Sequence, residues 1–146
     1  MKIYKITFIA LLFLLLQLPA FAQFESAFTE ENFAKQPPLT EVDFKAFLKS
    51  EAVYRYLEDG LQSSVTLEEA NAYVQKELGI SAERFLYVAA KLAICYTVMY
   101  DRGLSAAEQQ SFFATVPPYF SANANEQGLI EKYKVEIEAI FAKFNA

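Results

Sequence analysis

Two corners with the same order of residue types bracket the longest apolar stretch that follows residue 22, and they constrain the fold of the chain more than any other feature. Gly79-Ile80-Ser81-Ala82 precedes this stretch and Gly103-Leu104-Ser105-Ala106 follows it. Glycine ends helices because it readily adopts the left-handed conformation, and serine begins them because its hydroxyl binds free backbone N–H groups. The sequence therefore predicts tight helix-to-helix turns at both corners, with one helix from Ala82 to Arg102 between them.

This predicted helix is apolar on most of its circumference. One face carries Phe85, Val88, Ala89, Leu92, Tyr96 and Met99. Further apolar residues, Ala90, Ile94 and Val98, lie elsewhere around it. A helix that is apolar on most sides is usually central, so we expect the other helices to pack around it.

Capping residues and apolar spacing predict the remaining helices. They begin at Thr40, at Thr66, at Ala106 and near Asn123 or Asn125. The apolar stripe of the first changes phase near Ser50, so residues 40–59 form either one bent helix or two short ones. No strand pattern competes. The sequence thus predicts an all-α fold, a single orthogonal bundle of about five helices over residues 39–146.

Residues 1–22 have the three parts of an export signal. Two lysines precede an apolar run from Ile6 to Leu16, and Ala20-Phe21-Ala22 supplies small residues for cleavage. A retained membrane anchor is the alternative, but the run is shorter than the roughly 20 residues that span a bilayer. We expect cleavage after Ala22 and export to the periplasm or the cell exterior.

Residues 23–38 are predicted to be a linker between this signal and the helical domain. Pro37-Pro38 favours an extended chain over a helix that continues into the domain. A short amphipathic helix through Phe24, Ala27 and Phe28, packed loosely on the domain, is the alternative.

The mature chain is predicted to be acidic. Loss of Lys2 and Lys5 with the signal leaves 11 basic against 18 acidic residues, so the net charge changes from −5 to −7. Phosphate backbones and anionic lipid headgroups attract basic surfaces, and this charge therefore argues against nucleic acid and membrane surfaces as partners. Cys95 is the only cysteine. It cannot close an internal disulfide, and it is far from the position where a lipid is attached, so no stable membrane anchor is expected.

The chain contains no histidine, which removes the commonest general base and the commonest metal ligand. Ser-His-Asp and Cys-His arrangements and histidine-based zinc sites are therefore impossible, and no calcium-binding loop pattern is present. We expect no cofactor, no metal and no enzymatic activity. Paired carboxylates are the remaining catalytic alternative, with candidates Glu68, Glu69, Glu131 and Glu138.

Three basic residues form a line along the predicted central helix. Arg84, Lys91 and Arg102 fall within about 20° of one another on an ideal helical wheel. One interpretation is an anion site at the margin of the core. The other is that these residues pair with carboxylates of a neighbouring helix and lay their alkyl stems along the core edge.

Two further features are candidates for contact or reactivity. Tyr119 and Phe120 follow the rigid pair Pro117-Pro118, which suits a lid over an apolar pocket or a projecting contact for a partner protein. An ordinary loop whose rings plug one end of the bundle is the alternative. Cys95 is expected to be a small buried hydrophobe, with a reactive thiol or an intermolecular disulfide as the alternative.

The run from Gly79 to Leu92 resembles a block found in small exported bacterial proteins of uncharacterised function. Leu39-Thr40-Glu41-Val42-Asp43-Phe44 and Glu131-Lys132-Tyr133-Lys134 are similar to it as well. These motifs consist mostly of helix caps and core positions, so the resemblance implies a helical fold and carries over no functional residues.

Together these observations favour an exported, non-enzymatic binding module that recognises a protein partner. A carrier of an apolar or anionic small ligand, held between helices and gated by Tyr119 and Phe120, is the first alternative. A carboxylate-based hydrolase is the second. The oligomeric state is left open.

Overall fold

A computed structural model describes residues 29–60 and 66–144, so the predicted export signal lies outside the described residues. Within these ranges the regular secondary structure is entirely helical, which confirms the predicted all-α class. The α-helices are α2 (Glu30–Lys35), α3 (Glu41–Leu48), α4 (Glu51–Gly60), α5 (Leu67–Leu78), α6 (Ala82–Tyr96), α7 (Ala106–Thr115), α8 (Ala124–Lys132) and α9 (Lys134–Phe144). A π-helical turn, η2 (Thr97–Asp101), follows α6, and a 3₁₀ turn, η3 (Pro118–Phe120), lies between α7 and α8.

The described part of the chain is divided into more and shorter helices than the predicted five. Residues 40–59 belong to two helices, α3 and α4, and the buried Ser50 between them donates its hydroxyl to the Phe47 carbonyl at 2.6 Å. The predicted C-terminal helix is divided at Tyr133 into α8 and α9. A further helix, α2, lies within the segment that was predicted to be a linker.

Both predicted Gly-apolar-Ser corners are present and turn as expected. Gly79 and Gly103 have φ values of 74° and 65°, in the left-handed region that favours glycine. The Ser81 hydroxyl accepts a hydrogen bond from the Arg84 amide at the start of α6. The Ser105 hydroxyl accepts one from the Glu108 amide at the start of α7. Local chemistry therefore places the ends of the central helix.

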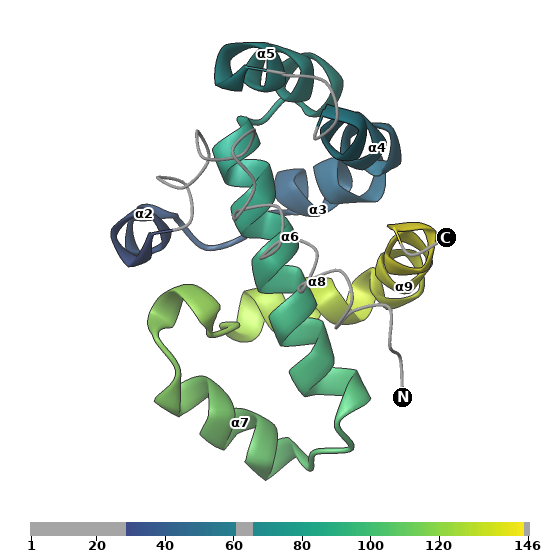
Figure 1. Ribbon diagram of the computed structural model, residues 1–146. Coiled ribbons are helices and arrows are strands. Elements are labelled where there is room, and N and C mark those ends of the chain that lie inside the picture. Colours follow the sequence, from purple (N-terminus) through teal and green to yellow (C-terminus); the bar gives the residue numbers. More distant parts are fainter. Residues whose placement is uncertain (1–28, 61–65, 145–146) are drawn as a thin grey trace.

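Helix α6 runs through the middle of the molecule, with α4 and α5 near its beginning, α7 beyond its end, and α8 and α9 crossing it (Figure 1). It contacts α3, α5 and η3, while α9 packs on α3 and α4. Large, fully buried apolar and aromatic side chains come from α6 itself and from other helices, and they include Phe44, Phe47, Tyr87, Leu92, Tyr96, Ile137 and Phe141. The central position predicted for this helix is thus observed.

The helix predicted from Ala82 to Arg102 is not α-helical over its full length. It changes at Thr97 into the π-helical turn η2, and Arg102 lies at the end of that turn. A π turn contains more residues than an α turn, so it shifts the angular position of every residue that follows. The wheel that placed Arg102 in line with Arg84 and Lys91 assumed a regular α-helix and is wrong beyond Tyr96.

Within the described ranges, no helix has both the length and the apolar character needed to cross a membrane.

Candidate functional site

The first two basic residues of the predicted line each meet a carboxylate in the first turn of another helix. Arg84, near the start of α6, forms a two-pronged ion pair with Asp43 of α3. Its Nη2 lies 2.7 Å from Oδ2 of the carboxylate, and its Nε lies 3.1 Å from Oδ1. This planar pairing fixes both the distance and the orientation between the two helices.

Arg84 also holds the extended segment between α2 and α3. Its guanidinium donates to the backbone carbonyls of Pro37 at 2.9 Å and Pro38 at 3.1 Å, and to the side-chain oxygen of Gln36 at 3.2 Å. Arginine can make these contacts together because its donors form a rigid fork.

Burial alone would raise the pKa of Asp43. Hydrogen bonds from Arg84 and Thr40, together with the charge of Arg84, outweigh burial and lower that pKa below its usual value. The carboxylate is therefore held in its ionised form.

The second ion pair is almost completely buried. Lys91 Nζ lies 2.7 Å from Glu126 Oε2, and only 3% and 2% of the two side chains are exposed. The same carboxylate accepts hydrogen bonds from the backbone N–H of Leu39 at 2.8 Å and of Asn123 at 3.0 Å. Glu126 therefore joins the connection before α3, the middle of α6 and the start of α8.

Asp43 and Glu126 play the same local role in their own helices. Each is the third residue of its helix, and its carboxylate binds the backbone of the N-cap residue, Thr40 or Asn123. These capping boxes satisfy N–H groups that would otherwise lack a partner at the helix start. Each of these capping carboxylates is thus also the counter-ion of a basic side chain of α6.

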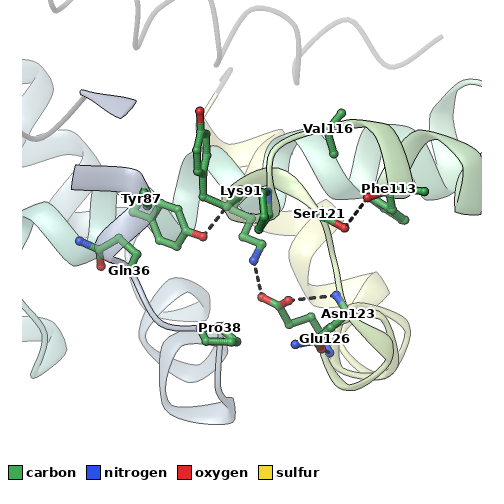
Figure 2. Close-up of a pocket in the computed structure, with 13 residues that line it drawn as sticks. Gln36, Pro38, Tyr87, Lys91, Phe113, Val116, Ser121, Asn123 and Glu126 are labelled. Atoms are coloured by element: carbon green, nitrogen blue, oxygen red, sulfur yellow. Dashed lines mark hydrogen bonds and ion pairs between the residues drawn. The ribbon is translucent and has the colours of Figure 1, made fainter. Parts of the chain in front are cut away.

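A pocket of about 580 Å³ opens beside the Lys91–Glu126 pair. Its walls come from residues 34–38, from Tyr87 and Lys91 on α6, and from residues 113–126, which include η3 (Figure 2). Most wall groups are apolar or aromatic. The polar groups include the Lys91 ammonium, the Glu126 carboxylate and the side chains of Gln36 and Asn123.

Tyr119 and Phe120 are half-buried in a cluster of rings. The ring of Phe33 in α2 lies 5.9 Å from that of Tyr119 and 5.4 Å from that of Phe120, measured between centroids. It also lies 5.7 Å from the ring of Tyr87. Tyr119 lines the pocket, whereas Phe120 is not among its wall residues. Both rings thus pack against the protein in place of projecting from it.

The Tyr87 hydroxyl connects α6 to the loop that carries these rings. It donates to the Tyr119 carbonyl at 2.8 Å. Burial, and then the negative charge of Glu126, raise the pKa of Tyr87 well above its usual value. The hydroxyl therefore stays protonated and keeps its donor.

Cys95 is a buried thiol, as the sequence predicts. Its Sγ lies 3.5 Å from the Phe120 carbonyl, and burial raises the pKa of the thiol to about 12. A cysteine of this kind carries very little thiolate at neutral pH, which is the reactive form.

The remaining candidates lie away from the pocket walls. Arg102 is exposed, and no ion pair to it is present within the described ranges. Glu68 and Glu69 are exposed at the start of α5, and Glu131 is exposed on α8, while Glu138 accepts a hydrogen bond from the Tyr96 hydroxyl at 2.9 Å. Among the residues that the structure describes, no group of three or more side chains is arranged to hold a metal ion.

Three residues of this region were not singled out as site candidates from the sequence: Tyr87, Glu126 and, as the partner of Arg84, Asp43. The pattern Asn123-x-x-Glu126 could have identified Glu126 as a capping residue. Nothing in the pattern indicates that its carboxylate also meets Lys91, because that pairing depends on how α8 packs against α6.

The pocket and the buried ion pair in its wall form the candidate site.

Comparisons of the chain with protein-family models, curated proteins and solved structures found no match.

Proposed function

We propose that this protein is a non-enzymatic binding protein that holds a small, largely apolar molecule in the pocket between α2, α6 and the α7–α8 connection. The observation that carries the proposal is the pocket itself. At about 580 Å³ it falls in the usual range for small-molecule sites, and its mostly apolar walls hold only a few polar groups.

The walls are held in place before any ligand arrives. Arg84 and Glu126 bind the backbone of residues 37–39 on one side, and Tyr87 binds the Tyr119 carbonyl on the other. A preformed site loses little conformational entropy when a ligand binds. This supports capture of a small molecule by a largely rigid pocket.

Recognition of a protein partner, which was the first expectation from the sequence, has less support at the predicted contact. Tyr119 and Phe120 are half-buried against Phe33, so they do not form a projecting anchor. Among the described residues, the large exposed apolar side chains are Val42 and Val135, which are 65% and 77% exposed, and isolated exposure of this kind is common on protein surfaces. Export remains part of the proposal, because residues 1–22 have the sequence pattern of an export signal.

The neutral, apolar dye N-phenyl-1-naphthylamine tests the pocket directly, because its fluorescence rises in apolar surroundings. We expect stoichiometric binding to the wild-type protein. Ala114→Trp, at an exposed position of the pocket wall on α7, should abolish binding by filling the space. Ala107→Trp, at an exposed position of the same helix that does not line the pocket, is the matched control and should bind normally.

Native mass spectrometry of protein purified from the cells that make it provides the second test. A retained adduct of a few hundred daltons that is present in the wild type and Ala107→Trp but lost in Ala114→Trp supports the proposal. Failure of the wild type to bind the dye, together with the absence of any such adduct, would overturn it. Equal dye binding by both tryptophan variants would show that binding occurs elsewhere.

A further inference from the structure

The Lys91 ammonium lines the pocket and has N–H donors to spare for a ligand. An ammonium group has three N–H bonds. Among the described residues, Lys91 forms one ion pair, in which its Nζ lies 2.7 Å from Glu126 Oε2, and the Tyr87 ring centroid lies 5.8 Å from the same Nζ. The side chain is only 3% exposed and lines the pocket. A ligand acceptor that reaches this ammonium from the pocket therefore gains a charge-assisted hydrogen bond, which is stronger than a hydrogen bond between neutral groups.

Glu126, in contrast, has no need of a ligand. Its Oε2 pairs with the Lys91 ammonium and accepts a hydrogen bond from the Leu39 N–H, and its Oε1 accepts one from the Asn123 N–H. It also lies in the first turn of α8, where the helix dipole stabilises negative charge. The polar chemistry that the pocket offers a ligand is therefore donation from Lys91.

The charge balance of the wall favours an uncharged acceptor over an anion. Lys91 and Glu126 neutralise each other, and the nearby Arg84 is neutralised by Asp43. A ligand carboxylate at Lys91 would place a second buried negative charge beside that of Glu126, with no additional positive charge to compensate it. A carbonyl oxygen accepts the same hydrogen bond without this cost.

We propose that the pocket binds an uncharged, apolar or aromatic molecule through a carbonyl oxygen that accepts a hydrogen bond from Lys91 Nζ. This inference rests on the proposed function and names the chemical class of its ligand. The apolar body lies against the walls formed by Pro38, Phe113, Val116 and Tyr119. The carbonyl sets the orientation of the molecule relative to α6.

Three probes of similar size separate the possibilities: acetophenone, which has a carbonyl; ethylbenzene, which has the same carbon skeleton and no acceptor; and benzoate, which is an anion. Their dissociation constants are measured by NMR titration of the ¹⁵N-labelled full chain. A hydrogen bond from a charged donor predicts that acetophenone binds about tenfold more tightly than ethylbenzene. It should also bind more tightly than benzoate.

The double variant Lys91→Met/Glu126→Gln removes the charged ammonium donor without leaving a buried carboxylate, and its fold is checked by circular dichroism. In this variant the ratio between acetophenone and ethylbenzene should fall to about one. A wild type that binds ethylbenzene as tightly as acetophenone would overturn the carbonyl inference, and a preference for benzoate would replace it with an anion site. Binding of N-phenyl-1-naphthylamine by the wild type, when none of the three probes binds, would also refute it while leaving the proposed function intact.

Discussion

Asp43 and Glu126 occupy the same position in two different helices, and each binds the backbone of its own N-cap residue as well as one basic side chain of α6. Their basic partners, Arg84 and Lys91, lie two turns apart on one face of that helix. The adjacent backbone N–H groups of Leu39 and Thr40 bind the two carboxylates in turn, Leu39 to Glu126 and Thr40 to Asp43. The extended segment before α3 is therefore fixed between two ion pairs.

The buried pair predicts strongly non-additive effects on stability. Lys91→Met should lower the free energy of unfolding by about 3–5 kcal/mol, because it leaves the Glu126 carboxylate buried without its counter-ion. The double variant with Glu126→Gln should lose less stability than the sum of the two single variants, because it removes both charges, although the single amide oxygen of glutamine can accept from only one of the Leu39 and Asn123 N–H groups. Urea unfolding of the wild type, both single variants and the double variant gives the coupling. Additive effects would contradict a direct interaction.

The several guanidinium contacts of Arg84 predict that lysine cannot replace this arginine. Arg84→Lys keeps the charge but cannot reach both Asp43 oxygens and the carbonyls of Pro37 and Pro38 together, so we expect a loss of about 1–2 kcal/mol in unfolding free energy. Arg102→Lys is the matched control, because Arg102 is exposed, and it should change stability by less than about 0.5 kcal/mol. Equal effects of the two substitutions would show that the fork does not matter.

The lowered pKa of Asp43 predicts the sign of its pH dependence. A carboxyl with a lower pKa in the folded than in the unfolded protein contributes stability above its unfolded pKa, and this contribution is lost as the pH falls through the folded value. The difference in unfolding free energy between the wild type and Asp43→Asn should thus be constant from about pH 7 to pH 5 and shrink below about pH 4. Unfolding curves at several pH values measure it. A difference that stays constant to pH 2 would rule out this pKa shift.

The buried Cys95 thiol predicts protection from alkylation. Iodoacetamide reacts with the thiolate, and both burial and a pKa raised to about 12 keep that form scarce in the folded protein. We expect the labelling rate in native buffer to be at least about 100-fold slower than in unfolding urea, as measured by intact mass. Rapid labelling in native buffer would show that the region around Phe120 opens easily.

Phe33 is expected to hold α2 against the rest of the protein. In Phe33→Ala, this six-residue helix should detach and leave the core largely intact, because α2 is too short to be stable alone. Amide hydrogen exchange should then show lost protection at residues 33 and 36, whose N–H groups bind within and just before α2. The Leu39 amide, held by Glu126, is the internal control and should stay protected. Protection that persists at residue 36 would show that other contacts hold α2.

The features that could be predicted from the sequence are those decided by neighbouring residues. Gly79-Ile80-Ser81 and Gly103-Leu104-Ser105 specify their turns because glycine conformation and serine capping act over a few positions. The apolar circumference of α6 likewise indicated its central place. The second interpretation of Arg84 and Lys91, ion pairing with neighbouring carboxylates, describes the contacts observed for both residues.

The features that the sequence left undecided depend on distant contacts or on helix irregularity. The pairing of Lys91 with Glu126 requires the packing of α8 against α6, and no local pattern records it. Helix α2 forms in a segment next to two prolines because Phe33 finds rings on α6 and η3 to pack against. Arg102 was misplaced because the π turn after Tyr96 has no clear signal in the apolar spacing.

The position of Glu126 along the chain also determines when the pocket can come into existence. Synthesis proceeds from the N-terminus, so Tyr87 and Lys91 leave the ribosome well before the residue that neutralises the ammonium. A nascent chain that ends before residue 126 lacks both the counter-ion and part of the pocket wall. In the proposed function, ligand capture therefore requires a chain that extends through residue 126, and the proposed ligand cannot act as a template for the earlier stages of folding.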